Sequence, residues 1–298
     1  MIVVDWGTTH LRAYRLTASG EIQARKAAAK GVMAIAPGTF AAVLEDVLGD
    51  WHADGLILMS GMIGSRQGWF EVPYVDCPAG LHEIAAGVKR VATLGKRTIG
   101  ICPGLVCRDA EGVPDVMRGE EVQIVGALPN ISEASSATIL LPGTHSKHAL
   151  VRNGRIERFL THMTGEVFAI LRDHSILGRL TTEHRPNLDA FDAGLDRAQQ
   201  PSGLLHHVFG VRTRVLMNEL EAAALTDYLS GILIGHELTS SPLPPPVLIV
   251  GEPALCALYE RALAHFKVNA EVTSADVATP RGLYALGKLV ERNMGDAL

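Results

Sequence analysis

The first sixty residues alternate short apolar segments with turn residues, a pattern typical of strands joined by tight connections. It predicts, in order, a buried strand Ile2–Val4, an alternating strand Leu11–Leu16, a turn at Ser19-Gly20, a strand around Ile22, a helix over Phe40–Val47 and an apolar strand Leu56–Met59. A charged residue, Asp5, follows the first of these strands directly. Since a charge at a buried strand end is costly without a partner, Asp5 marks a candidate site.

A second series of the same kind begins near residue 138. It consists of an apolar strand Thr138–Leu141, the turn "PGTHSK" at Pro142–Lys147, a short strand Ala149–Val151, a hairpin signal at Asn153-Gly154, a returning strand Ile156–Leu160 and a helix from Thr164 through Arg172. Both series therefore read strand, turn, strand, hairpin, strand, helix. The repetition predicts two similar halves, and chance recurrence of short strands is the alternative.

The rest of the chain reads mostly as helix. The candidates are helices Leu188–Ala198, Leu204–Phe209 and Asn218–Ile234, a proline-rich connector Ser240–Pro246, a strand Val247–Val250, a helix from "GEPAL" (Gly251–Leu255) through His265 and a last helix Arg281–Val290. Apolar residues such as Leu220, Leu225 and Tyr228 lie at helical spacing and are expected in a core rather than in a base-binding pocket.

Composition narrows the class of protein. The chain has 298 residues, 47% of them hydrophobic and 20% charged, with a net charge of −5, so it has no basic footprint for nucleic acid. We expect no membrane partner and a cytoplasmic protein, because no leader or membrane-length apolar run is present. The four scattered cysteines read as buried apolar residues, and His145 with His148 lacks a third metal ligand.

Three strand ends lead into turns that carry glycine, at Asp5–Thr9, Gly143–Lys147 and Gly251–Pro253. Backbone amides in such turns and at helix starts bind phosphate because they present unpaired donors. Neither the P-loop nor the GxGxxG pattern occurs after a strand. Three turns in two similar halves predict instead a nucleotide held between two domains.

These residues resemble the actin, hexokinase and Hsp70 superfamily, and four segments resemble the 2-dehydro-3-deoxygalactonokinase family more closely. The segments are "IVVDWGTTHLRAYRL" (Ile2–Leu16), "SGMIGSRQGWFEVPYVDCPA" (Ser60–Ala79), "DVMRGEEVQIVGAL" (Asp115–Leu128) and "LLPGTHSKH" (Leu140–His148). The chain departs from the pattern at His148, where the family leads us to expect Trp, and at Pro142, where the superfamily usually carries an acidic residue.

The resemblance implies an α/β fold of the duplicated ribonuclease H-like, actin-like ATPase type, with two domains and an ATP cleft between them. The expected domains are residues 1–128 with 279–298, which would bind the sugar acid, and residues 129–278, which would bind ATP. A homodimer is one assembly that the sequence allows.

The resemblance also implies the cofactors ATP and Mg²⁺. Asp5 would face the metal through water, because Mg²⁺ prefers carboxylate oxygen and keeps several waters. The other nucleotide contacts would be Gly7, Thr8 and Thr9 in the first half, and Gly143, Thr144, Ser146, Lys147 and Gly251 in the second. From the residues alone, Asp5 is equally well explained as a carboxylate that caps the following turn.

"RGEE" at Arg118–Glu121 begins an apolar helix, where carboxylates are favourable for the helix dipole alone. In related sugar kinases a carboxylate at the equivalent place removes the proton from the attacking hydroxyl, which implies Glu120 first and Glu121 second as the base. For a sugar-acid substrate, Arg66 is the first candidate to bind the carboxylate, with Arg118 as the alternative. Ser65 and Gln67 would contact hydroxyls, and Trp69 would wall the pocket. A merely solvated Arg66 is the competing interpretation.

The predicted function is an ATP-dependent kinase that phosphorylates the 6-hydroxyl of 2-dehydro-3-deoxy-D-galactonate to 2-dehydro-3-deoxy-6-phosphogalactonate, a step of galactonate catabolism. The sugar acid is implied by the resemblance. A non-enzymatic sensor of sugar acid or ATP, and a phosphohydrolase on the same fold, are the alternatives.

Overall fold

The structure is a computed structural model that describes residues 1–51, 55–92, 97–131, 136–180 and 183–295. Its contacts group the chain into two compact units. Unit 1 comprises Met1–Ser136, Ala149–Phe159 and Thr273–Leu298, and unit 2 comprises Ala137–His148 and Leu160–Val272. The segment Ala149–Phe159 thus groups with unit 1, whereas the sequence-based division assigns it to the second domain. Residues 296–298 of the expected first domain lie outside the described residues.

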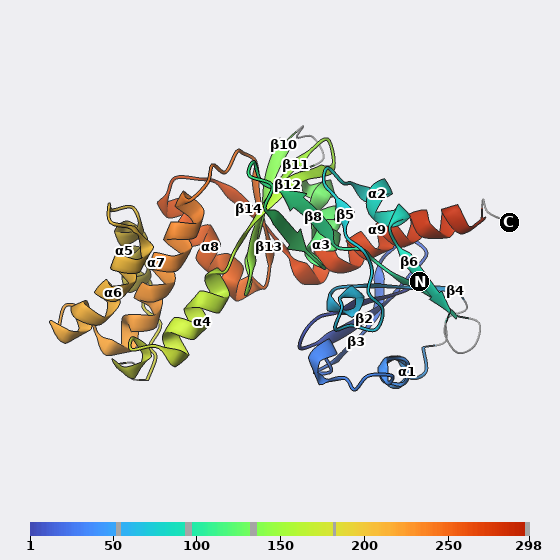
Figure 1. The fold of residues 1–298 in the computed structure, drawn as a ribbon, viewed down its shortest axis with the longest axis horizontal. Helices are drawn as coiled ribbons and strands as arrows, with labels where there is room; N and C mark the ends of the chain where they lie inside the picture. The colour runs from blue at the N-terminus through green and yellow to red at the C-terminus, as the bar shows by residue number, and fades with distance from the viewer. Residues whose placement is uncertain (52–54, 93–96, 132–135, 181–182, 296–298) are drawn as a thin grey trace. The chain divides into compact units, whose positions relative to one another are not determined.

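The main sheet of unit 1 has six strands in the order β3-β2-β1-β4-β7-β6 (Figure 1). Its strands are β1 (Ile2–Trp6), β2 (Leu11–Leu16), β3 (Ile22–Ala28), β4 (Gly55–Ser60), β6 (Lys89–Ala92) and β7 (Arg97–Ile101). β1 is antiparallel to β2 and parallel to β4. The four strands predicted in this half are confirmed: the apolar runs of β1 and β4 are mostly buried, β2 is buried at four of its six residues, and β3 is a partly exposed strand at the edge of the sheet.

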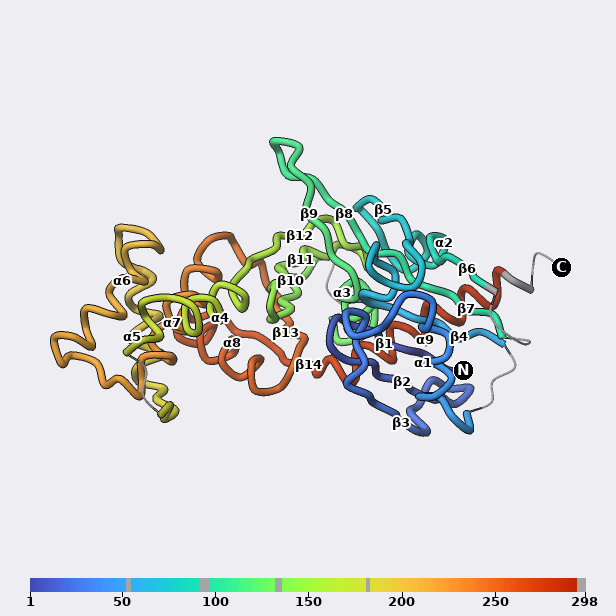
Figure 2. Tube along the Cα trace, turned by 60° about the horizontal axis from the view of Figure 1, so that its bottom comes forward, coloured from blue at the N-terminus to red at the C-terminus, as the bar shows by residue number. Residues whose placement is uncertain are grey.

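Helices pack around this sheet within unit 1. They are α1 (Phe40–Leu48), α2 (Leu81–Ala86), α3 (Glu120–Ala127) and α9 (Ala275–Gly295), and a small second sheet joins β5 (Val75–Asp76), β8 (Leu105–Arg108) and β9 (Pro114–Met117). α3 and α9 lie side by side in both views (Figure 1 and Figure 2). Gly126 and Gly282 allow this approach, since a β-carbon on either would overlap the backbone of the other helix.

The five-stranded sheet has the order β12-β11-β10-β13-β14. Its strands are β10 (Ser136–Leu141), β11 (Ser146–Arg152), β12 (Arg155–His162), β13 (Val247–Gly251) and β14 (Ala270–Ser274). β10 is parallel to β13, as β1 is to β4, so the predicted duplication of the strand order is confirmed. One boundary is wrong: the strand predicted at Ala149 begins at Ser146, inside the motif expected to be a turn.

Unit 2 also holds five α-helices among its described residues. They are α4 (Thr164–His174), α5 (Leu188–Ala198), α6 (Gly203–Leu216), α7 (Leu225–Thr239) and α8 (Pro253–His265). The helix predicted from Asn218 is wrong at its start, because Asn218 takes φ 59° after the end of α6 and α7 begins only at Leu225. α9 in turn begins six residues before the predicted Arg281 and accommodates Pro280 within its length.

The expectation that Leu225 and Tyr228 belong to a core is confirmed, since both side chains are buried among helices α4 to α7 and Leu220 packs against them. Within the described residues, no helix is both long and apolar enough to span a bilayer.

Candidate active site

Asp5 lies in β1 of unit 1 and is flanked in the sheet by a residue of each neighbouring strand. The register pairs it with Arg12 on β2 and with Ser60 on β4. Arg12 Nη1 lies 3.6 Å from Asp5 Oδ2, and the Asp5 side chain is 20% exposed. Burial raises the pKa of Asp5 to about 6 although Arg12 lowers it, and the nearby Glu120 raises it further. The Asp5 carboxyl is therefore largely shielded from water, although part of the side chain reaches the surface.

The turn after β1 is fixed by its own backbone and by a second segment. The Gly7 amide donates to His10 O at 2.9 Å, and the Val32 amide donates back to Gly7 O at 3.0 Å. Thr8 and Thr9 are exposed on this turn. The Thr9 hydroxyl and His10 Nδ1 are 2.9 Å apart. The predicted phosphate contacts of the first half thus lie together on a braced, solvent-facing turn.

Two glycines bring three separate motifs of unit 1 to the same place. A β-carbon on Gly61 would lie 2.8 Å from Trp6 O and 3.2 Å from Asp5 Oδ1, and one on Gly119 would lie 3.3 Å from Gly61 Cα. Both glycines have positive φ, 91° and 109°. The end of β1, the turn after β4 and the turn before α3 therefore meet within unit 1.

The two glutamates at the start of α3 have different surroundings. Glu120 is partly exposed, and its Oε2 accepts a hydrogen bond from the Arg118 amide at 3.0 Å. Glu121 is fully buried, and its Oε2 accepts from the Gly119 amide at 2.6 Å. Burial raises the pKa of Glu121 to about 8, and the charge of Glu120 adds to the rise. Glu120 can reach a ligand, whereas Glu121 holds the turn.

Arg118 presents an unsatisfied cationic group beside these carboxylates. Its Nη2 donates to Val72 O at 2.8 Å, and its guanidinium lies 4.4 Å from the centre of the Tyr74 ring. Within the described part of the chain, its buried Nε and Nη1 have no hydrogen-bond partner. Gly64 makes room for it, since a β-carbon there would lie 2.9 Å from Nη1. Buried donors of this kind indicate a missing acceptor.

The neighbouring loop places the other predicted substrate residues less favourably. The Arg66 side chain is 83% exposed and pairs with Glu71 at 3.3 Å. The buried Ser65 hydroxyl donates to the exposed Gln67 at 3.4 Å. Trp69 stacks on Phe40 with ring centres 6.3 Å apart and packs against the core of unit 1. These contacts make Arg66 a solvated residue and Trp69 mainly a packing residue.

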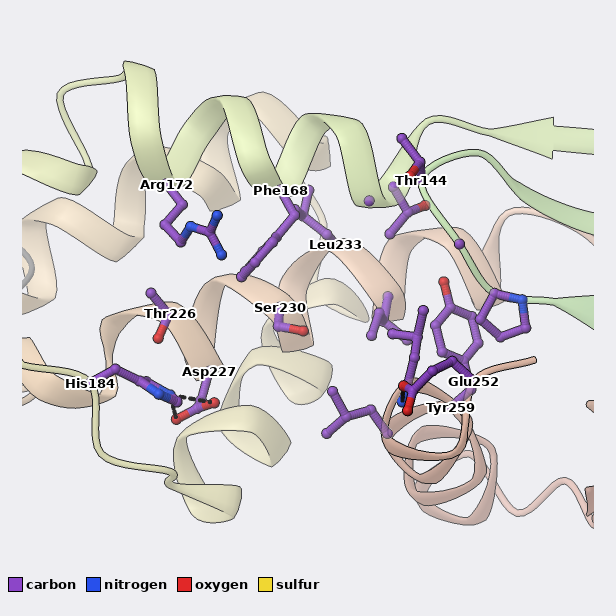
Figure 3. Close-up of a pocket in the computed structure, with 17 residues that line it drawn as sticks. Thr144, Phe168, Arg172, His184, Thr226, Asp227, Ser230, Leu233, Glu252 and Tyr259 are labelled. Atoms are coloured by element: carbon purple, nitrogen blue, oxygen red, sulfur yellow. Dashed lines mark hydrogen bonds and ion pairs between the residues drawn. The ribbon is translucent and has the colours of Figure 1, made fainter. Parts of the chain in front are cut away.

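Unit 2 contains a cavity of about 700 Å³, a size that suits a nucleotide. Gly143 and Thr144 line it together with Thr164 and Gly165 at the start of α4 (Figure 3). Glu252 lines it from the start of α8. The N-terminal ends of two helices and a glycine turn therefore lie around one cavity.

The second-half turn is held by the start of α4. The Glu166 amide donates to Thr144 O at 3.0 Å, and a β-carbon on Gly165 would lie 2.8 Å from Thr144 Cα and overlap Gly143 O. His145 Nε2 and Glu166 Oε2 are 2.5 Å apart at the surface. The structure also places Gly251 beside this turn, since a β-carbon there would lie 3.6 Å from Pro142 O.

Ser146 and Lys147 occupy other positions than those expected of turn residues. Both belong to β11 and are buried, with 0% and 4% exposure. The Ser146 hydroxyl donates to Glu237 Oε1 at 2.7 Å. The expectation that its hydroxyl faces a phosphate is thus corrected: the side chain points into the fold, because β11 begins earlier than the turn motif suggests.

The far end of the cavity carries residues that no motif indicated. Arg172 and Phe168 face it from α4, with the guanidinium 5.3 Å from the ring centre, and Asp227 faces it from α7 (Figure 3). His184 Nε2 lies 3.1 Å from Asp227 Oδ2. Thr226 also lines this end, and its buried hydroxyl has no partner among the described residues. Only tertiary structure brings these residues together, so no local pattern could reveal them.

The oxygen donors of unit 1 fit Mg²⁺. In the ranges that the structure describes, no three His, Cys, Asp or Glu side chains cluster as a set of metal ligands. Asp5 and Glu120 interact electrostatically, however, and Mg²⁺ in phosphoryl-transfer sites is held by one or two carboxylates, with waters and substrate phosphates completing the shell.

The repeated sheet order is that of the two-domain actin-like fold. A sequence profile of the 2-keto-3-deoxy-galactonokinase family matches residues 5–286. The chain belongs to this family.

Two relatives are similar over nearly their whole length. The chain is 32% identical to the 2-dehydro-3-deoxygalactonokinase of Escherichia coli (strain K12), over 97% of this chain and 98% of the relative. It is 36% identical to DgoK1 of Rhizobium meliloti (strain 1021), a candidate 2-dehydro-3-deoxygalactonokinase, over 96% of both chains.

Solved structures with similar folds include a candidate member of this family. A crystal structure of a candidate 2-dehydro-3-deoxygalactonokinase from Sinorhizobium meliloti has a TM-score of 0.89 at 35% identity and covers 97% of this chain and 98% of its own. The activator of the 2-hydroxyisocaproyl-CoA dehydratase from Clostridium difficile, solved with bound ADPNP, has a TM-score of 0.51 at 13% identity and covers 99% and 97%. The second likeness concerns the fold alone, and the expected fold class is confirmed.

Proposed function

We propose that this protein is an ATP-dependent kinase that phosphorylates the 6-hydroxyl of 2-dehydro-3-deoxy-D-galactonate. The names of its relatives support the substrate. The single observation that carries the proposal is the meeting of Asp5, Gly61 and Gly119 in unit 1 of a chain that matches the family over residues 5–286. This meeting supports a metal-binding role for Asp5 and a general base at the start of α3.

The nucleotide binds in the cavity of unit 2. Its phosphates lie at the Gly143–Thr144 turn and the start of α4, where amide donors and the positive end of the helix dipole attract negative charge. The base lies toward Phe168 and Arg172, which offer a planar apolar face and a cation. Gly251 lets the chain pass close to Pro142 at the phosphate end.

Asp5 would hold Mg²⁺, with Glu120 nearby as a second carboxylate. Mg²⁺ held there would supply positive charge that offsets the charge of the transferred phosphoryl group. Thr8 and Thr9 donate to phosphate oxygens from the exposed turn after β1. The positive charge of Arg12 partly offsets the negative charge of Asp5 when no metal is bound.

Glu120 removes the proton from the attacking hydroxyl. A base must reach its substrate, and Glu120 is partly exposed while Glu121 is enclosed. Glu121 positions Gly119 and so the start of α3. The raised pKa of Glu121 fits a carboxyl that stays protonated at neutral pH and does not take part in transfer.

Arg118 binds the carboxylate of the sugar acid. Its buried Nη1 has no partner among the described residues and can donate a charge-assisted hydrogen bond to a carboxylate, which a neutral sugar lacks. This assignment replaces Arg66 as the first candidate, because Arg66 is exposed and already paired with Glu71.

The ATP cleft between the two domains and the homodimer stay predictions.

An assay that couples ADP release to a visible signal tests the proposal, with purified protein, Mg²⁺ and a panel of 2-keto-3-deoxy acids and neutral sugars. We expect ADP release only with a sugar acid, and fastest with 2-dehydro-3-deoxy-D-galactonate. Equal release without any sugar acid contradicts a kinase and indicates a phosphohydrolase. Binding of sugar acid or ATP without turnover indicates a sensor.

A further inference from the structure

Unit 2 contains a buried carboxylate to which the proposed reaction gives no role. Glu237 lies near the end of α7, and its side chain is 1% exposed. Its Oε1 accepts hydrogen bonds from Ser146 Oγ at 2.7 Å and His148 Nε2 at 2.9 Å. Its Oε2 accepts from Tyr259 Oη at 2.6 Å. A buried charge without hydrogen-bond partners is costly, so Glu237 depends on these donors, and they in turn are held in place by its carboxylate.

Each donor belongs to a wall of the cavity or to the segment directly behind one. Ser146 is the first residue of β11 and follows the turn that contains Gly143 and Thr144. Tyr259 on α8 lines the cavity. Thr164, the first residue of α4, also lines the cavity and donates to Glu237. One carboxylate thus ties the phosphate turn, α4 and α8 to α7.

The pKa of Glu237 agrees with a carboxylate that is ionised in the folded protein. Burial alone would raise the pKa of Glu237, but the hydrogen bonds from His148, Thr164 and Tyr259 bring it below its ordinary value. Hydrogen bonds to an ionised acceptor are stronger than neutral ones, so the carboxylate restrains these segments more than a neutral side chain would. Glu237 is not one of the residues that line the cavity.

We propose that Glu237 is a positioning residue for the nucleotide: it fixes the Gly143–Thr144 turn through Ser146, the start of α4 through Thr164 and the middle of α8 through Tyr259. This inference rests on the proposed nucleotide site. Because the walls are held before the ligand arrives, binding does not have to order them, and affinity for the nucleotide is higher. The acceptor hydroxyl is bound by other residues and should not be affected.

Three variants test this role: Ser146→Ala, Glu237→Gln and, as a matched control, Thr138→Val. The Thr138 hydroxyl is also buried and donates to Pro244 O at 2.7 Å, but neither residue lines the cavity. Affinity for AMPPNP with Mg²⁺ is measured by calorimetry, and steady-state kinetics and melting temperature are measured for the same preparations.

We expect Ser146→Ala to weaken AMPPNP binding about tenfold and Glu237→Gln about thirtyfold, in line with the loss of charge-assisted hydrogen bonds. The KM for ATP should rise likewise, while kcat at saturating ATP and the KM for the sugar acid change less than about twofold. Thr138→Val should lower the melting temperature without changing AMPPNP affinity. If Glu237→Gln does not fold, Ser146→Ala decides.

Equal melting-temperature losses in Ser146→Ala and Thr138→Val, with AMPPNP affinity unchanged in both, overturn the positioning role and leave Glu237 as part of the core only. A wild-type protein that does not bind AMPPNP at all overturns the proposed function itself. The two failures are distinguished by the wild-type titration.

Discussion

Glu121 accepts a hydrogen bond from the Gly119 amide at 2.6 Å through one carboxylate oxygen, while its other oxygen is buried without a partner among the described residues. The carboxyl therefore has one satisfied side and one side from which water is excluded. Such a group prefers to be neutral, and this preference links the stability of the protein to pH.

The first prediction concerns this linkage. The pKa of Glu121 is raised to about 8 in the folded protein, above its ordinary value of 4.5, so the folded state binds an additional proton between these values. The free energy of unfolding should therefore fall as pH rises through this window. The Glu121→Gln variant has a neutral side chain at every pH. Relative to the wild type, its free energy of unfolding should therefore increase by more than about 1 kcal/mol between pH 5.5 and pH 8.5.

Urea unfolding of both proteins at the two pH values measures this difference. The comparison of the two proteins, rather than the slope of either, isolates residue 121, because other groups such as Asp5 titrate in both. Unfolding free energies that run parallel across the range would show that Glu121 is ionised in the folded state.

The second prediction separates the two glutamates by activity. Glu120→Gln should lower kcat about 10²- to 10⁴-fold with little change in either KM, because only proton removal in the transition state is lost. Glu121→Gln, compared at a pH near 7, should retain most of kcat since it keeps an acceptor for the Gly119 amide. A larger loss in Glu121→Gln than in Glu120→Gln reverses the assignment of the base.

Much of the fold could be predicted from the sequence because its strands carry their own signal. β1 and β2 were found from an apolar run and an alternating run, and the paired hairpins revealed the duplication. The start of α7 could not be found, because Asn218 interrupts an otherwise continuous apolar periodicity with a left-handed backbone. The short strands β5, β8 and β9 have too few residues for a periodic pattern.

Some residues of the candidate site could likewise be predicted from the sequence, and others could not. Asp5, Glu120 and Gly143 stand in local motifs, so their sequence neighbours mark them. Glu237 contacts Ser146 across 91 positions, and nothing near either residue indicates the partner. The role of Arg118 likewise depends on what its guanidinium lacks, which is a property of packing and not of sequence.

The third prediction compares two arginines. Arg118→Ala should raise the KM for the sugar acid about 10- to 100-fold, because a charge-assisted hydrogen bond from a buried guanidinium to a carboxylate is lost. Arg66→Ala is the control, since its side chain is 83% exposed, and it should change this KM less than about twofold. Steady-state kinetics with varied sugar acid at saturating ATP measure both, and the opposite ranking restores Arg66 as the anchor.

The fourth prediction uses the glycines of the phosphate turn. A β-carbon on Gly143 would meet no atom within 4 Å, so Gly143→Ala should change the free energy of unfolding by less than about 1 kcal/mol. The same methyl group would stand where a phosphate must approach the backbone, so the Kd for ATP should rise tenfold or more. Calorimetry with ATP and thermal unfolding give the two quantities.

Two further glycines are the controls for this prediction. Gly165→Ala would place its methyl against the backbone of Gly143 and Thr144, and it should destabilise the protein by about 1–3 kcal/mol as well as weaken ATP binding. Gly210→Ala, inside α6 with nothing within 4 Å, should stabilise the protein by about 0.5–1 kcal/mol and leave the Kd unchanged. If Gly143→Ala behaves like Gly210→Ala in the ATP titration, the phosphates do not approach this turn and the nucleotide must lie elsewhere in the cavity.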